Sequence, residues 1–260
     1  MAFVAPALFY LGAWRAPGRI ATALLIAALA LHAGSLLIAI RSPEGWRFGF
    51  ASILSATVWV GVAVVWLEAL SAGLKVLRGL LLPVAALVVM LPLVFPGAEL
   101  GEHAARPMFV LHLLAGTLAY GVLSLAALHA VLMAVAERAL HAGAGTPRGW
   151  TAGVLEDLPP LLALERILFR LITIGFIFLT LTAVTGVFFS EQVFGKPLTF
   201  DHKTLFTLVS WLVFGVLLLG RHQRGWRGKT ALRLTLGGFS LLLLAYVGSR
   251  FVLEVILRRG

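Results

Sequence analysis

The sequence contains no cysteine, which excludes disulfides, thiolate metal sites and covalent thioether attachment of a haem to this chain. Charged residues are also scarce: they make up 12% of the 260 residues, whereas soluble domains average about 25%. No Ser-His-Asp order, glycine-rich phosphate loop or metal-ligand spacing is present. The chain is instead 60% hydrophobic, with a mean hydropathy of +1.00. These features predict an integral membrane protein that is not an enzyme.

Long apolar runs dominate the sequence, and a run of about 20 residues is long enough to cross a bilayer. They predict a bundle of about eight transmembrane helices, at residues 3–14, 20–40, 50–70, 79–97, 107–134, 167–190, 204–220 and 231–255. No connecting segment is long enough for a soluble domain. Residues 1–260 are therefore expected to form a single all-α integral-membrane domain.

The net charge of +10 is spread over short loops, so we expect contact with membrane lipid rather than with nucleic acid. Thirteen Lys and Arg residues fall in the loops after the first, third, fifth and seventh predicted helices, and eight fall on the other side. Because positive loops remain in the cytoplasm, both termini are predicted on the outer, periplasmic side. The longest loop, 137–166, is then cytoplasmic.

Histidines inside apolar runs are the polar residues that most need an explanation. His112 is followed by Gly116 and Tyr120 at i+4 and i+8, so these three residues share one helix face. A small residue one turn from a histidine leaves room for a flat ligand, or for a closely packed helix. His32 near the middle of its run suits a ligand role or a neutral imidazole bonded to a group such as Ser35.

The remaining histidines suggest a second group at the inner side. His129 lies about 25 Å beyond His112 along the same predicted helix. His222 begins the loop after the seventh helix, and either residue could simply extend its ring to the interface.

Carboxylates are absent from the middle of the predicted helices, which argues against a pump. Zinc needs three or four converging ligands, whereas haem needs one or two axial histidines in an apolar slot. The pattern therefore favours haem.

Several segments resemble the cytochrome c assembly family of membrane proteins (CcsA/CcmC-like), and most closely its YpjD/HemX-type branch. They are "MFVLHLLAGTLAYGVLSLAALHAVL" (108–132), "LPPLLALERILFRLITIGFIFLTLTAVTGVFF" (158–189), "FDHKTLFTLVSWLVFGVLLLGRHQRGWRGKTA" (200–231) and "LLAYVGSR" (243–250). The resemblance is strongest over 107–250. It implies a multi-pass protein of the bacterial cytoplasmic (inner) membrane that handles haem b without covalent attachment.

The resemblance also implies site residues. His112 matches an outer histidine of haem-delivering relatives. Asp201, Lys203 and Trp211 match the end of their Trp-rich outer segment, although the preceding tryptophans have no counterpart here. His222 stands one turn beyond the position of a second family histidine, and the histidine expected after the last helix has no counterpart.

The leading hypothesis is a haem-binding protein of cytochrome c assembly or haem homeostasis, with His112 as the axial ligand of the iron. His32, His202 and His222 are candidates for the other axial position. Lys203, Arg106 and Arg47 are candidates for pairing with the propionates. The alternative is a non-haem scaffold or regulatory subunit that docks a membrane or cytoplasmic protein through loop 137–166. A transporter is disfavoured because the sequence shows no inverted repeat.

Overall fold

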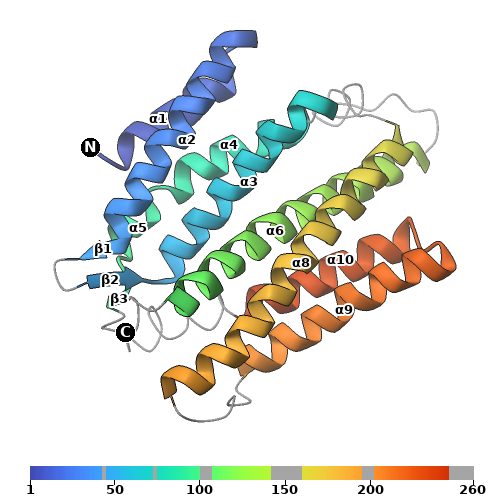
Figure 1. Cartoon of the computed structure of the whole chain (residues 1–260). Helices are drawn as coiled ribbons and strands as arrows, with labels where there is room; N and C mark the ends of the chain where they lie inside the picture. Colours follow the sequence, from blue (N-terminus) through green and yellow to red (C-terminus); the bar gives the residue numbers. More distant parts are fainter. Residues whose placement is uncertain (43–44, 73–74, 100–106, 142–159, 195–201, 246–260) are drawn as a thin grey trace.

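The computed structural model describes residues 1–42, 45–72, 75–99, 107–141, 160–194 and 202–245. These ranges form a helical bundle with a small sheet at one end (Figure 1). The helices are α1 (Val4–Arg15), α2 (Gly18–Ile40), α3 (Phe50–Ala72), α4 (Lys75–Val88), α5 (Leu91–Val94), α6 (Pro107–His141), α8 (Leu161–Phe194), α9 (His202–Arg224) and α10 (Lys229–Leu243). The strands are β1 (Arg41–Ser42), β2 (Gly45–Phe48) and β3 (Ala98–Glu99). Each predicted helical range overlaps at least one of these helices.

Within the described ranges, five helices contain segments long and apolar enough to cross a membrane, at Gly18–Ile40, Phe50–Leu67, Met108–Arg138, Leu161–Phe188 and His202–Arg224. A further apolar stretch, Leu81–Val94, is shorter. Helix α1 has 12 residues and is about 18 Å long, less than the roughly 30 Å of a hydrocarbon core. The helical multi-pass architecture is thus confirmed, and five of the eight predicted spans are confirmed by length and composition.

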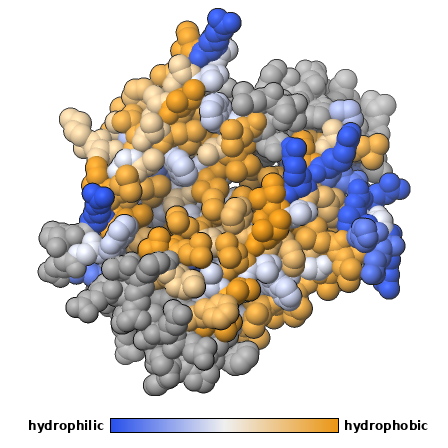
Figure 2. Space-filling model, in the orientation of Figure 1, coloured by the Kyte–Doolittle hydropathy of each residue, from blue (hydrophilic) through white to orange (hydrophobic). Residues whose placement is uncertain are grey.

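Apart from α4 and α5, which both run toward the sheet, successive helices run in opposite directions, so the connections alternate between the two ends of the bundle (Figure 1). The turn from α1 to α2 and the turn from α9 to α10 lie at the end away from the sheet. Hydrophilic residues gather toward the ends, and apolar residues cover the surface between them (Figure 2). This is the surface expected of a protein whose middle is surrounded by lipid. The membrane side that each end faces stays a prediction.

The sheet was not predicted. Its strands pair antiparallel in the order β1-β2-β3, with Arg41 opposite Trp46 and Arg47 opposite Glu99. Arg47 Nη2 lies 3.3 Å from Glu99 Oε1, so this arginine, a candidate for pairing with a propionate, has a carboxylate partner. The pairing joins segments separated by 52 positions, which local sequence patterns do not reveal.

The predicted helix 79–97 is interrupted. Helix α4 continues through Pro83 and ends at Val88, and the short helix α5 begins at Leu91 with Pro92 in its first turn. Proline has no backbone N–H and restricts the residue before it, so Pro92 ends one helix and suits the first turn of another. The interruption brings the chain to the sheet at β3.

Helix α6 is the central helix and packs against α3, α8 and α10. Small residues allow the close approach: a Cβ added to Gly175 of α8 would lie 2.5 Å from the side chain of Leu123 in α6. A Cβ added to Gly121 of α6 would lie 2.6 Å from Val60 of α3. Close contact through glycine is the usual way that membrane helices associate. A separate core around Tyr10 joins α1, α2, α3 and α4.

Candidate functional site

The predicted face of α6 lines a cavity. His112, Gly116 and Tyr120 all contribute to one cavity of about 290 Å³, together with residues of α3, α8, α9 and α10. This volume lies just below the roughly 300–1,000 Å³ that ligand sites occupy. The cavity lies toward the end of the bundle that carries the sheet, because α6 begins there and His112 is near its start (Figure 1). The shared helix face predicted for these three residues is confirmed.

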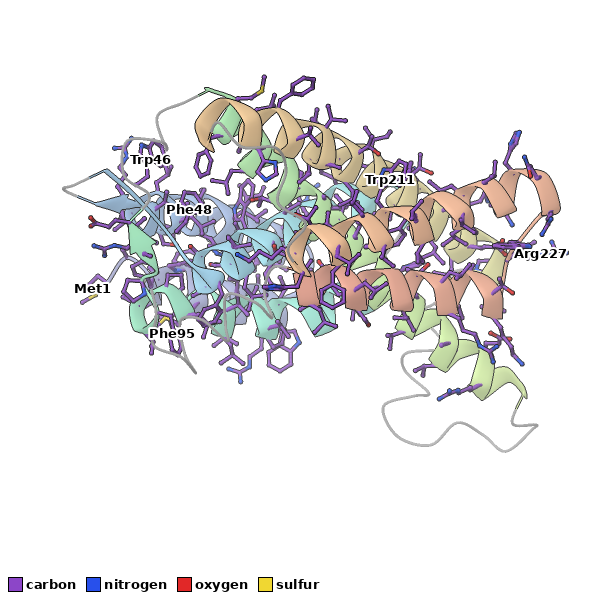
Figure 3. All side chains as sticks on the ribbon, turned by 90° about the horizontal axis from the view of Figure 1, so that it is seen from below. Met1, Trp46, Phe48, Phe95, Trp211 and Arg227 are labelled. Carbon is purple, nitrogen blue, oxygen red and sulfur yellow. The ribbon has the colours of Figure 1, made fainter. Side chains whose placement is uncertain are left out.

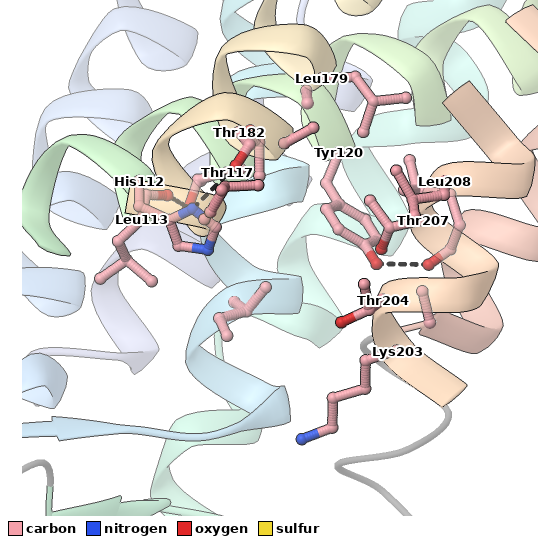
Figure 4. Close-up of a pocket in the computed structure, with 18 residues that line it drawn as sticks. His112, Leu113, Thr117, Tyr120, Leu179, Thr182, Lys203, Thr204, Thr207 and Leu208 are labelled. Carbon is pink, nitrogen blue, oxygen red and sulfur yellow. Dashed lines mark hydrogen bonds between the residues drawn. The ribbon is translucent and has the colours of Figure 1, made fainter. Parts of the chain in front are cut away.

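His112 is held by the neighbouring helix α8. Its Nδ1 lies 3.0 Å from the carbonyl oxygen of Thr182 and 3.2 Å from Oγ1 of Thr185. A carbonyl can only accept, so Nδ1 carries the proton that it donates to Thr182. Nε2 is then the nitrogen with the lone pair, and Figure 4 shows this atom turned away from Thr182 toward the cavity. An imidazole arranged in this way can serve as a metal ligand through Nε2.

The absence of a side chain at Gly186 makes room for the ring. A Cβ added to this residue would lie 3.2 Å from Cε1 of His112 and 3.5 Å from its Nδ1. One turn earlier on the same helix, Thr182 supplies the carbonyl that the ring contacts. The α8 segment therefore fits the imidazole closely. Sequence reasoning missed these α8 residues, because the hydrogen bond connects positions 70 apart.

The walls of the cavity are effectively apolar, although several threonines line it. Thr117 donates to the carbonyl of Leu113 at 2.9 Å, and Thr182 donates to the carbonyl of Phe178 at 2.8 Å. These hydroxyls are bonded within their own helices, a common arrangement for threonine in helices. The hydroxyl of Tyr120 donates to the carbonyl of Leu242 in α10 (Figure 4). The cavity thus offers an imidazole set in a largely apolar surface.

The first turn of α9 supplies a positive charge at the edge of the cavity. Lys203 lines it, and its side chain extends from the start of α9 (Figure 4). His202 is exposed and does not line the cavity. Asp201 lies outside the described residues. Trp211 donates from Nε1 to Thr180 Oγ1 at 2.9 Å and connects α9 to α8 without lining the cavity.

His32 is elsewhere and already has two partners. It is fully buried, with Nδ1 at 2.9 Å from the hydroxyl of Tyr10 and Nε2 at 2.8 Å from Oγ of Ser55. Both ring nitrogens are used, and the three residues connect α1, α2 and α3. Of the two interpretations left open by the sequence, the structure supports the core histidine. The prediction that His32 could be the second axial ligand is not supported.

The inner histidines are far from His112. His222 lies exposed in the last turn of α9, at the end of the bundle opposite His112. His129 is fully buried, with Nε2 at 2.9 Å from the carbonyl of Leu164. His112 and His222 lie at opposite ends of helices that run in the same direction (Figure 1), so they cannot bind one iron together. The proposed pairing of these two residues is therefore corrected.

Fold and cavity together define a multi-pass helical membrane protein with a histidine-lined cavity near one end. The sequence model of the family described as "Cytochrome C assembly protein" matches residues 20–257. This chain belongs to that family.

Individual relatives are similar over most of the chain. The inner membrane protein YpjD of Escherichia coli strain K12 is 30% identical over 250 residues, which cover 94% of this chain and 89% of that protein. An uncharacterized 28.8 kDa protein of Azospirillum brasilense is 30% identical over 243 residues, covering 86% of this chain and 85% of that protein. The cytochrome c biogenesis protein CcsA of a Prochlorococcus marinus strain is 33% identical over 89 residues, 34% of this chain and 28% of that protein.

Proposed function

We propose that this chain binds a haem b non-covalently in the cavity at the start of α6, with Nε2 of His112 as axial ligand. The protein would hold or pass on haem in cytochrome c assembly or haem homeostasis, in the bacterial inner membrane. The observation that carries the proposal is the orientation of His112, whose Nδ1 contacts the Thr182 carbonyl while Nε2 faces the cavity.

The residues around the cavity fit a haem. Iron-bound histidines usually donate their other ring N–H to a carbonyl or carboxylate, which fixes the tautomer and the ring orientation. The helices around His112 provide apolar walls for a macrocycle, and Lys203 provides a cation that can pair with a propionate. A bound haem would supply the iron centre, and His112 would hold it as the one histidine among the described residues that line the cavity.

The proposed role requires no catalytic group of this chain. His112 and the helices around it would bind and orient a cofactor made elsewhere, and the apolar walls would keep water from it. With no cysteine in the sequence, any haem held here is released without breaking a thioether bond to the protein. We accordingly propose a binding protein rather than an enzyme.

The test is the visible spectrum of detergent-purified protein from haem-supplied cells. Wild type should show a Soret band, which His112→Ala should lose or shift. His222→Ala is the matched control, because it removes an exposed histidine at the opposite end and should leave the band unchanged. A wild-type protein that stays free of haem under these conditions would overturn the proposal.

In that event the scaffold hypothesis becomes the better one. Its proposed docking segment is 137–166, of which residues 142–159 lie outside the described residues. Replacing this loop should then abolish co-purification of a partner protein, and a loop-replaced variant that still retains its partners would exclude docking there.

A further inference from the structure

The turn between α9 and α10 carries a concentration of positive charge that the proposed haem site does not use. We call residues Arg221–Arg233 the basic turn. Its exposed cations are Arg224, Arg227, Lys229 and Arg233. The sequence has no Asp or Glu between positions 202 and 245, so neither helix of this hairpin offers a neutralising carboxylate. Figure 2 shows the hydrophilic cluster at this end, and Figure 3 shows Arg227 at the tip of the hairpin.

A set of contacts around Arg221 holds the turn in place. Arg221 Nη1 lies 2.5 Å from Oε1 of Glu165 in α8 and 3.3 Å from the carbonyl oxygen of Trp226. The guanidinium also lies over the ring of Phe169, 4.6 Å from its centroid. These contacts come from α8 and from the turn itself. Arg221 therefore ties the hairpin to the rest of the bundle.

The backbone of the turn is tightly folded as well. The ring of Trp226 lies directly against Gly220, where a side chain would collide with it. Gly225 and Gly228 have φ values of +66° and +55°, which other residues adopt at a cost. A turn held in this way fixes the backbone positions of its cations, so little loop entropy is lost when an anion binds.

Glu165 is engaged by Arg221 and does not neutralise the other cations. It is 8% exposed, and its carboxylate contacts Arg221. Among the described residues, Arg224, Arg227, Lys229 and Arg233 form no ion pair with a carboxylate. Within the part of the chain that the structure describes, four exposed cations without a carboxylate partner therefore lie in and just after the last turn of α9.

That position is the level of lipid headgroups. The span His202–Arg224 has 23 residues and is about 34 Å long, slightly more than the roughly 30 Å of a hydrocarbon core. The turn that follows must lie at the interface, where lipid phosphates are found. Arginine binds phosphate oxygens through two parallel N–H groups, which gives both strength and orientation.

We propose that the basic turn is a binding site for the headgroup of an anionic phospholipid of the phosphatidylglycerol class. The four uncompensated cations match a headgroup with net negative charge. A zwitterionic headgroup fits less well, because its own ammonium group opposes them. The site is at the end of the bundle opposite His112, so the proposal does not depend on haem.

The experiment is native mass spectrometry of the detergent-solubilised full chain, titrated with dioleoyl-phosphatidylglycerol or dioleoyl-phosphatidylcholine. Wild type should bind the anionic lipid more tightly. Arg224→Gln/Arg227→Gln should weaken that binding by roughly 25-fold, about fivefold for each cation removed. Arg224→Lys/Arg227→Lys should retain most of the affinity because the charges remain.

Arg15→Gln/Arg19→Gln is the matched control, since it removes two exposed cations from the α1–α2 turn at the same end of the bundle. It should leave the affinity within about twofold of wild type. Equal binding of the two lipids, an unchanged affinity in Arg224→Gln/Arg227→Gln, or an equal loss in the control pair would overturn the proposal. If the basic turn binds an acidic protein instead of lipid, that protein stays bound in the mass spectrum and wild type shows no preference between the two lipids. This result would also overturn the proposal. Size-exclusion profiles check that each variant is folded.

Discussion

Replacing Gly186 by alanine tests how closely α8 fits His112. The new methyl carbon would lie 3.2 Å from Cε1 of the imidazole, closer than most real Cβ contacts. Both atoms belong to membrane helices that pack tightly, so the ring must move by a few tenths of an ångström. The hydrogen bond from Nδ1 to the Thr182 carbonyl, now 3.0 Å, would lengthen or lose alignment. Such bonds usually span about 2.7–3.2 Å, and they weaken steeply when the N–H···O angle falls below about 120°.

The expected magnitude follows from the role of that bond. Disturbing the group that orients a metal-ligating histidine typically lowers metal affinity by about 10- to 100-fold. The assay is a titration of haem into detergent-purified apoprotein, followed by the Soret absorbance. We expect Gly186→Ala to bind haem roughly 10- to 100-fold more weakly than wild type. Its loss of haem affinity should be smaller than that of His112→Ala.

Gly215→Ala is the control for this substitution. It also adds a methyl group at a helix contact, but at 3.5 Å from Cζ of Phe176 and outside the cavity. It should leave the haem affinity unchanged. If Gly186→Ala is folded and binds haem as tightly as wild type, the reasoning that α8 positions the ligand is refuted.

Two further predictions concern stability. His32→Ala removes a ring that bonds both Tyr10 and Ser55 and leaves two buried hydroxyls without that partner, so thermal denaturation in detergent should show a loss of about 2–5 kcal/mol. The same variant should retain its haem spectrum, and loss of the Soret band from folded protein would contradict the placement of His32 outside the site. Glu165→Gln leaves the Arg221 guanidinium without its anionic partner, and because that arginine is partly exposed we expect a loss of only about 1 kcal/mol. A cost above about 4 kcal/mol in the same melting experiment would show that the pair contributes more than its exposure allows.

The positions of the helices were largely predictable from the sequence. Helix α2 was expected at 20–40 and α3 at 50–70, and they occupy Gly18–Ile40 and Phe50–Ala72. An apolar run of spanning length has few alternatives, because backbone groups in lipid must be bonded within the helix. Helix α8 begins six residues before its predicted start, because it continues through the charged pair Glu165 and Arg166 that interrupts the apolar run.

The candidate site was predictable in part. The face formed by His112, Gly116 and Tyr120 follows from helical periodicity alone, and it does line the cavity. The grouping of the other histidines was not predictable, because each interpretation depended on which helices are neighbours. His32 bonds residues of two other helices, 22 and 23 positions away, whereas the sequence only showed a polar residue in an apolar run.

By itself, the sequence determined that the protein lies in a membrane, where most of its helices run, and which face of α6 carries His112. These properties depend on composition and on the fixed period of the helix, which are local. Only the tertiary structure decided which nitrogen of His112 faces the cavity, that His222 lies at the opposite end, and that Arg221 pairs with Glu165. Those outcomes depend on contacts between helices distant in the sequence, and a hydrogen bond or an ion pair forms only when both partners are brought within a few ångströms.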